Sequence, residues 1–136
     1  LHTHNTEKLW KAISGIVTFL DQETDQIWRI SVPPSQGADL LFKLKEKLKF
    51  DAFFDWGGGL IWLSESNETK YSERIIRQVM SEQSGHATLF RASNKDRKNF
   101  DVFNPQSNAL MNITRKIKKN FDPYGVLNPE RMYEGV

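Results

Sequence analysis

The residues of this sequence that are able to carry chemistry are few and scattered. His2 and His4 stand at i and i+2 near the N-terminus. That spacing suits a metal pair, but chain ends fray, and a frayed end is the favoured interpretation. His86 stands where a helix is expected to give way to a strand, and a histidine there more often makes a structural hydrogen bond. There is no cysteine, so thiolate metal sites and disulfides are excluded.

The sequence contains no G-x-G-x-x-G, P-loop, H-E-x-x-H or nucleophile-elbow pattern. Its one glycine run, 57–59, lies between two apolar segments and not between a strand and a helix. It therefore predicts a hairpin turn at Gly57 and Gly58, with Phe54 facing Ile61, and makes a poor phosphate cradle. No metal site is predicted, and these residues alone do not support an autonomous catalytic site.

The hairpin at residues 51–64 is apolar on both of its faces. A hairpin with one wet face should alternate apolar and polar residues. We therefore expect a cover on both sides, one from the chain's own helices and the other from something missing from this chain. The alternative is an edge hairpin with a few exposed aromatic residues.

Composition narrows the class of protein. The 136 residues suffice for one domain, and 19 basic against 17 acidic residues give weak support for a polyanion partner. We expect no nucleic-acid partner. No apolar run approaches the ~20 residues of a membrane helix, so we expect no transmembrane segment. The start at Leu1 predicts a processed product or a fragment.

The segment that best shows a strand pattern is 26–32. It places Trp28 and Ile30 on one face and Arg29 and Ser31 on the other, as a half-buried strand does. Helical spacing follows at 38–48 and at 67–84, and the remaining predicted elements are the hairpin, a strand at 86–91, an N-terminal helix at 6–14 and a C-terminal helix at 105–120.

This order predicts an α+β fold, a ferredoxin-like βαββαβ antiparallel sheet with extra N- and C-terminal helices. Right-handed crossovers put both inner helices on one sheet face. The other face stays open and carries Arg29, Ser31 and one side of the hairpin; periodicity does not decide which side.

The end of the chain is harder to assign to regular structure. Residues 92–103 are polar without a period and predict a loop. The tail, 121–133, has too many proline and glycine breakers for a helix and too many apolar residues for a solvated end. We expect it to pack onto this domain through Val126, Leu127 and Met132.

The tail reads DPYGVLNPERMY from Asp122 to Tyr133. It resembles the closing motif of FAD-linked oxidases of the vanillyl-alcohol oxidase type, which commonly end in a D-P-x-G-x-x-N-P-G-[RK] run. Three more stretches are similar to the E subunits of bacterial glycolate oxidases: WRISVP at 28–33, DWGG at 55–58 followed by Trp62-Leu63, and GHAT at 85–88. Order and spacing agree across most of 26–133. Glu130 departs from the usual glycine.

The resemblance implies that residues 1–136 are a single domain, the C-terminal cap of such an oxidase, without the N-terminal domain that binds FAD. Asn128 and Arg131 match the tail motif and are implied to lie on the cofactor side. Pro129 is expected to hold Asn128 in an extended backbone. FAD is expected in the full-length protein and none on this chain alone, which would be inactive. The implied partners are the missing FAD domain and other glycolate oxidase subunits. We expect a cytoplasmic location, with any membrane association through those subunits.

The family's reaction oxidises a small 2-hydroxy acid, glycolate to glyoxylate, by hydride transfer to FAD. A carboxylate substrate favours arginine, which binds it at two points. Arg29 on the open face is the candidate for that contact; the competing interpretation is a surface or interdomain salt bridge. Asp55 and His86 match positions specific to the E subunits and are further candidates.

Two other functions suit the same order of elements. An RNA-recognition module would stack bases on sheet aromatics, but no [KR]-G-[FY]-[GA]-F pattern lies on a strand. A small-ligand or oligomerisation domain would use the open sheet face for self-association.

Overall fold

The computed structural model describes residues 3–19, 26–66 and 71–136. The expectations placed on His2 and on the helix start at 67–70 lie outside these ranges. The helices are α1 (Thr3–Ser14), α2 (Gly37–Lys45), α3 (Ser72–Ser81), α4 (Asn94–Asn99) and α5 (Asn108–Phe121), with short 3₁₀ turns η1 (Val17–Phe19), η2 (Pro34–Gln36) and η3 (Trp56–Gly58). The strands are β1 (Gln26–Ser31), β2 (Phe50–Asp55), β3 (Leu60–Glu65) and β4 (His86–Arg91).

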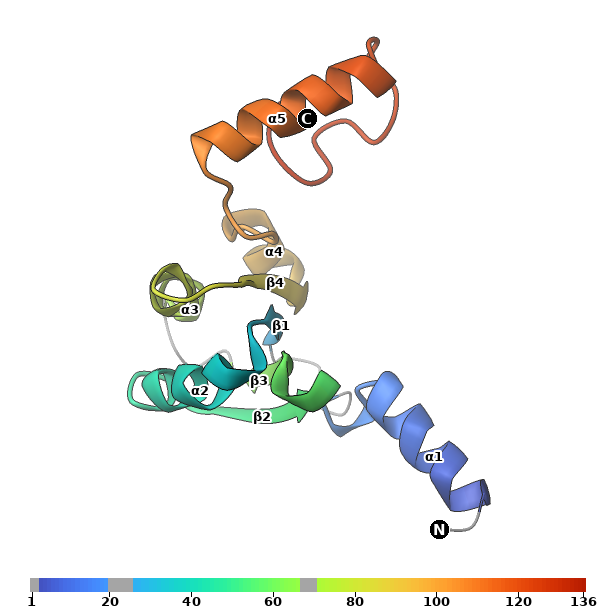
Figure 1. Ribbon diagram of the computed structural model, residues 1–136, viewed down its shortest axis with the longest axis vertical. Helices are drawn as coiled ribbons and strands as arrows, with labels where there is room; N and C mark the ends of the chain where they lie inside the picture. Colours follow the sequence, from blue (N-terminus) through green and yellow to red (C-terminus); the bar gives the residue numbers. More distant parts are fainter. Residues whose placement is uncertain (1–2, 20–25, 67–70) are drawn as a thin grey trace.

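The four strands form one antiparallel sheet in the order β2-β3-β1-β4. Both crossover helices, α2 and α3, lie on the same side of it (Figure 1). This is the arrangement that right-handed βαβ crossovers produce. The predicted α+β, ferredoxin-like fold with added terminal helices is confirmed.

The main core fills the space between the sheet and these two helices. Trp28, Ile30, Ile61 and Leu63 face the helices from the central strands and are fully buried or nearly so. They meet the apolar stripes of α2 and α3, which are Leu40, Leu44, Ile76, Val79 and Met80. Each such burial stabilises the fold by roughly 1.5–3 kcal/mol.

The hairpin has the predicted register, with Phe54 opposite Ile61. Its connection is longer than a two-residue turn, since η3 and Gly59 separate the strands. The second face of the hairpin is covered in part by this chain itself: Ile16 and Phe19, both buried, pack with β1 and β3 residues in a second apolar cluster. The expectation that this cover is missing from the chain is wrong to that extent.

A helix missed from the sequence, α4, follows β4. Its signal is an N-cap serine, because the Ser93 hydroxyl accepts from the Asp96 N–H (3.1 Å) and donates to the Asp96 carboxylate (2.8 Å). The lack of an apolar period hid it, since a six-residue helix with no buried residue needs none.

The C-terminal arm, which we define as α5 and residues 122–136, stands beyond β4 and away from β2 (Figure 1). None of the 14 residues of α5 is buried. The prediction that the tail packs onto the domain through Val126, Leu127 and Met132 is wrong, because these side chains are 74%, 62% and 54% exposed. The helix face of the sheet is already filled by α2 and α3, so it leaves the tail no apolar surface.

Candidate functional site

The open face of the sheet gathers three of the residues singled out from the sequence. Strand alternation puts Arg29 on this face, between Trp62 of β3 and Thr88 of β4. Asp55 and His86 occupy the next row, at the opposite edges β2 and β4. The hairpin side that shares this face is therefore the one with Asp55 and Trp62.

Arg29 turns toward the hairpin. Its guanidinium Cζ lies 5.4 Å from the centroid of the Trp56 ring, in cation–π range. The side chain is half-buried, and it makes no hydrogen bond or ion pair with any residue in the described part of the chain. The competing interpretation of Arg29 as one half of a surface or interdomain salt bridge therefore finds no partner among the described residues, which leaves its interdomain form.

Asp55 is engaged in the turn itself. Its carboxylate Oδ1 accepts a hydrogen bond of 2.7 Å from the backbone N–H of Trp56. Trp56 has a φ of +51°, which residues with a Cβ rarely adopt. Asp55 therefore stabilises the backbone that holds the Trp56 ring beside Arg29.

His86 lies apart from this pair, on the edge strand β4 opposite Ser31. It is exposed, and its position is set by the glycine before it. A Cβ on Gly85, whose φ is +150°, would lie 2.2 Å from the Ser31 carbonyl oxygen, so only glycine permits this approach. Since Arg29 reaches toward β2, the structure places Arg29 and His86 on one face without bringing them into contact.

Aromatic side chains border the open face. Phe90 is 53% exposed and meets Trp62 edge-on at 5.1 Å between ring centroids. Trp56 is 67% exposed. The face therefore combines solvent-facing aromatic surface with one guanidinium that has no counter-ion among the described residues. This combination is suited to a small anionic ligand that lies under a planar group.

Asn128 and Arg131 form a second, separate group on the C-terminal arm. Both are exposed, and the Arg131 N–H donates to the Asn128 carbonyl at 3.3 Å. Asn128 has a φ of +45°, so the expectation that Pro129 keeps it extended is wrong. Glu130, in the place of the family's glycine, also adopts a positive φ, +58°.

The arm is organised by Asp122, a residue whose role the sequence did not reveal. Its carboxylate pairs with Lys118 at 2.7 Å and accepts the N–H groups of Val126 (2.9 Å) and Leu127 (2.8 Å). The bond to Lys118 and then these two backbone donors lower the pKa of Asp122 to about 2. Lys118 also donates to the Leu127 carbonyl. The sequence signal that could have indicated this role of Asp122 is the D-P-x-G pattern directly after a predicted helix.

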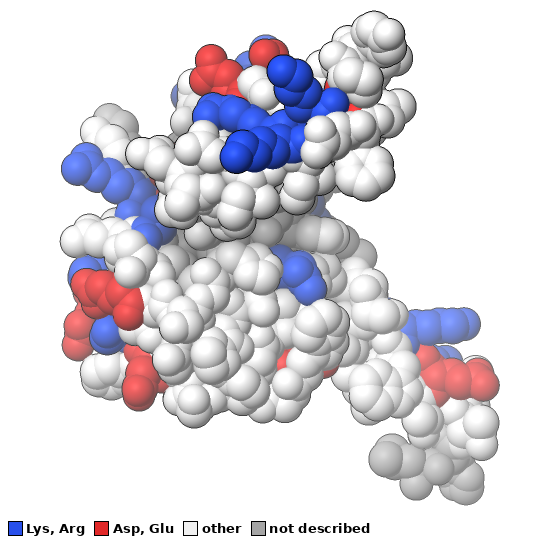
Figure 2. Space-filling model, turned by 45° about the horizontal axis from the view of Figure 1, so that its top comes forward, with Lys and Arg blue, Asp and Glu red and all other residues white. Residues whose placement is uncertain are grey.

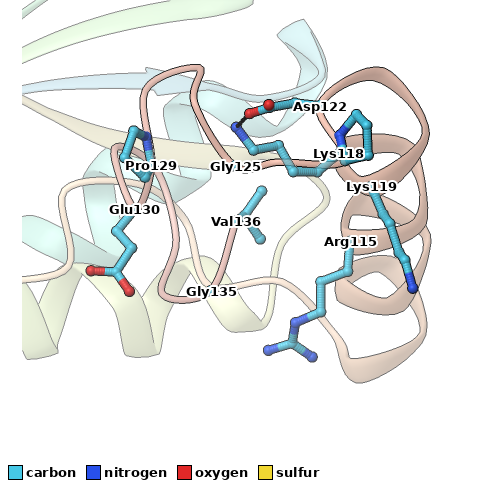
Figure 3. A pocket seen from close by; sticks show the side chains of 10 residues that line it. Arg115, Lys118, Lys119, Asp122, Gly125, Pro129, Glu130, Gly135 and Val136 are labelled. Carbon is cyan, nitrogen blue, oxygen red and sulfur yellow. Dashed lines mark ion pairs between the residues drawn. The ribbon is translucent and has the colours of Figure 1, made fainter.

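Basic side chains gather on the C-terminal arm (Figure 2). Between α5 and the tail lies a hollow of about 450 Å³, where Lys118 reaches Asp122 and where Arg115 and Lys119 also line the wall (Figure 3). In the described part of the chain no group of three His, Cys, Asp or Glu side chains is placed to hold a metal ion. No helix of that part is long and apolar enough to cross a membrane.

Comparison with known proteins gives one informative similarity. The chain is 36% identical over 107 residues to glycolate oxidase subunit GlcE of Escherichia coli (strain K12). The match covers 79% of this chain and 26% of that subunit, so the chain spans about a quarter of the relative's length. No family model and no solved structure matches significantly. The resemblance found in the sequence is confirmed for a region related to this subunit.

Proposed function

We infer that this chain, which is related to a region of a glycolate oxidase subunit, is a C-terminal cap domain that lies over the substrate side of a flavin held by another domain. The observation that carries the proposal is Arg29, a half-buried guanidinium on the open sheet face with no carboxylate partner in the described part of the chain. A cation kept in this way is suited to an anionic group supplied from outside.

The residues present do not fit the FAD dinucleotide itself. Its pyrophosphate needs converging backbone N–H groups, normally at a glycine-rich turn that opens a helix. The glycine run joins β2 to β3. The start of α2 is closed, because Gly37 is buried against the hairpin and a Cβ there would lie 2.9 Å from the Gly58 carbonyl oxygen. The proposal therefore places FAD on a domain outside this chain, which holds none by itself.

In this proposal Arg29 binds the carboxylate of a small 2-hydroxy acid and fixes the position of the adjacent hydroxyl-bearing carbon. The guanidinium offers paired N–H donors that match a carboxylate in two-point fashion. His86 remains a candidate for a second polar contact at the β4 edge of the same face. Asn128 and Arg131 are proposed to face the flavin domain from the arm.

The surface of α5 supports the presence of a neighbouring domain. An apolar stripe runs along the helix and is about half or more exposed: Leu110 48%, Ile113 53%, Ile117 54% and Phe121 84%. Exposed apolar surface of this extent normally marks an interface. In the proposed full-length protein the flavin domain, together with other oxidase subunits, covers it.

The test uses the full-length subunit assembled in its oxidase. Arg29→Gln should lower kcat/KM for glycolate about tenfold or more, mainly through KM, because a charged hydrogen bond to the substrate is lost. Arg29→Lys keeps the positive charge but not the paired donors of the guanidinium, so its kcat/KM should fall less. Arg74→Gln, an exposed arginine on α3, is the matched control. Unchanged kinetics in Arg29→Gln would refute the role of Arg29.

The same exposed apolar stripe on α5 favours a second candidate function, which is self-association of two copies of this chain. Against it, α5 has no acidic residue and carries Arg115, Lys116, Lys118 and Lys119, so pairing two copies of α5 brings like charges together. Light scattering on the chain decides: a monomer across concentrations supports the cap, and a concentration-independent dimer supports an oligomerisation domain.

A further inference from the structure

We propose that Trp56 is the positioning residue for Arg29, and that Asp55 acts by fixing the backbone of Trp56 and not by touching the substrate. This inference rests on the proposed function for its ligand, a small carboxylate, but its structural half is independent of that function. It assigns two residues of the hairpin turn to the anion site on the open face.

The first step is the way in which Arg29 is held. Its Cζ lies 5.4 Å from the Trp56 ring centroid, and the guanidinium makes no hydrogen bond or ion pair within the described residues. Cation–π contact uses the charge of the group while leaving its N–H donors unsatisfied. The ring can therefore restrain the arginine without competing for the donors that a carboxylate needs.

The second step is the way in which Trp56 is held. Positive φ runs through three successive residues, +51° at Trp56, +61° at Gly57 and +96° at Gly58. The two glycines adopt such angles freely, whereas the tryptophan does so against its own Cβ. The 2.7 Å bond from the Trp56 N–H to the Asp55 carboxylate is the local interaction that stabilises this conformation.

The third step concerns charge. Asp55 shares the open face with Arg29, and the two do not form an ion pair. An ion pair there would occupy the guanidinium and exclude an anionic ligand. Because the Asp55 carboxylate accepts the Trp56 N–H, its charge is directed to the turn, and Arg29 stays available.

The structural half is tested by NMR on this chain. Arginine side-chain protons near an indole face shift upfield, and those of Arg29 should do so. Trp56→Leu should abolish the shift, and Trp56→Phe, which keeps an aromatic face, should restore part of it. Trp10→Leu, another exposed tryptophan (60%) on α1, is the control. Because Trp56 is 67% exposed, both Trp56 variants should keep the melting temperature of the unchanged chain.

Asp55 is tested by two substitutions that separate acceptor from charge. Asp55→Ala removes the acceptor and should erase most of the Arg29 shift, whereas Asp55→Asn keeps an amide oxygen and should retain it. Asp51→Ala, on the same strand and face, is the control. A wild-type Arg29 without an upfield shift, or a shift that survives Trp56→Leu, overturns the inference.

The ligand half is tested by titrating the chain with glycolate and, as a neutral probe, glycolamide. Glycolate should move the Arg29 Nε–H resonance and glycolamide should not. Trp56→Leu should weaken the glycolate response about two- to fivefold, although Arg29 is intact. If the ring shift behaves as expected but glycolate gives no response, the positioning inference stands and the proposed substrate role of Arg29 fails.

Discussion

The guanidinium of Arg77 lies over the indole of Trp28, with 5.2 Å between the Arg77 Cζ and the ring centroid. From there Arg77 donates to the carbonyls of Asp101 (2.6 Å) and Phe103 (3.0 Å) and to the Asn104 side chain (3.1 Å). It also pairs with Glu73 at 3.4 Å. Burial lowers the pKa of Arg77 and Glu73 opposes that shift, yet an arginine stays charged. Arg77 thus ties the segment that leads to α5 onto the core.

Replacing Arg77 should destabilise the domain more than any other arginine change on α3. Arg77→Lys leaves several part-buried carbonyls without a donor, and we expect a loss of about 2–4 kcal/mol in the free energy of unfolding. Arg74→Lys on the same helix is exposed and should change it by less than about 0.5 kcal/mol. Urea denaturation of both variants checks this; equal stabilities would show that the Arg77 contacts contribute nothing net.

Low pH should detach the tail from α5, because protonation of Asp122 weakens the contacts of its carboxylate with Lys118 and the tail. Its folded pKa of about 2 lies below the roughly 3.9 of an unfolded aspartate. The stabilisation is therefore complete above about pH 4 to 5 and is lost as the pH falls through the folded pKa. The amide resonances of Val126 and Leu127 should titrate with that midpoint, and in Asp122→Asn the transition should disappear. A midpoint near 4 would show that these contacts do not stabilise the Asp122 carboxylate.

Glu130→Gly should stabilise the turn in the tail. Glu130 has a φ of +58° and donates its N–H to the Val136 carbonyl at 2.7 Å. A residue with a Cβ pays roughly 1 kcal/mol for a left-handed conformation, and glycine does not. Amide exchange at residue 130 should slow about fivefold in Glu130→Gly. Glu130→Ala, which keeps the Cβ, serves as the comparison and should show no slowing.

Polar substitution on the α5 stripe should leave this chain's stability almost unchanged. Ile113 is 53% exposed, so Ile113→Ser removes little buried surface, and binding of a hydrophobic dye should fall. Ile76 is fully buried, and Ile76→Ala should cost about 2–5 kcal/mol. In the full-length protein Ile113→Ser should loosen the arm from its neighbour, seen as faster proteolysis after residue 105. An unchanged rate of proteolysis in the full-length Ile113→Ser variant would argue against an interface at the α5 stripe.

The sequence by itself determined the sheet. Alternation at 26–32, the glycine run after Phe54 and the helical stripes around Leu44 and Ile76 all report local periodicity and burial, which one chain encodes directly. The tail motif and Trp28-Arg-Ile-Ser were enough to indicate the related oxidase subunit, because several short matches in order are hard to produce by chance.

Tertiary structure alone decided what each candidate residue touches. Arg29 lies on β1 and Trp56 lies in the turn η3 between β2 and β3, and only the path of that turn brings the ring to the guanidinium. The role of Asp55 as an acceptor for Trp56 depends on a positive φ that no residue preference announces. Arg77 gave no signal, because its partners are backbone carbonyls some 25 residues away.

The tail shows the limit of reasoning from apolar content. Val126 and Leu127 are apolar and were expected inside, but burial needs an unfilled apolar surface, and that depends on how α2 and α3 pack. The polar contacts of Asp122 then fixed the path of the tail against α5. Local sequence specifies which side chains gain from burial, whereas the three-dimensional packing specifies whether any partner remains for them.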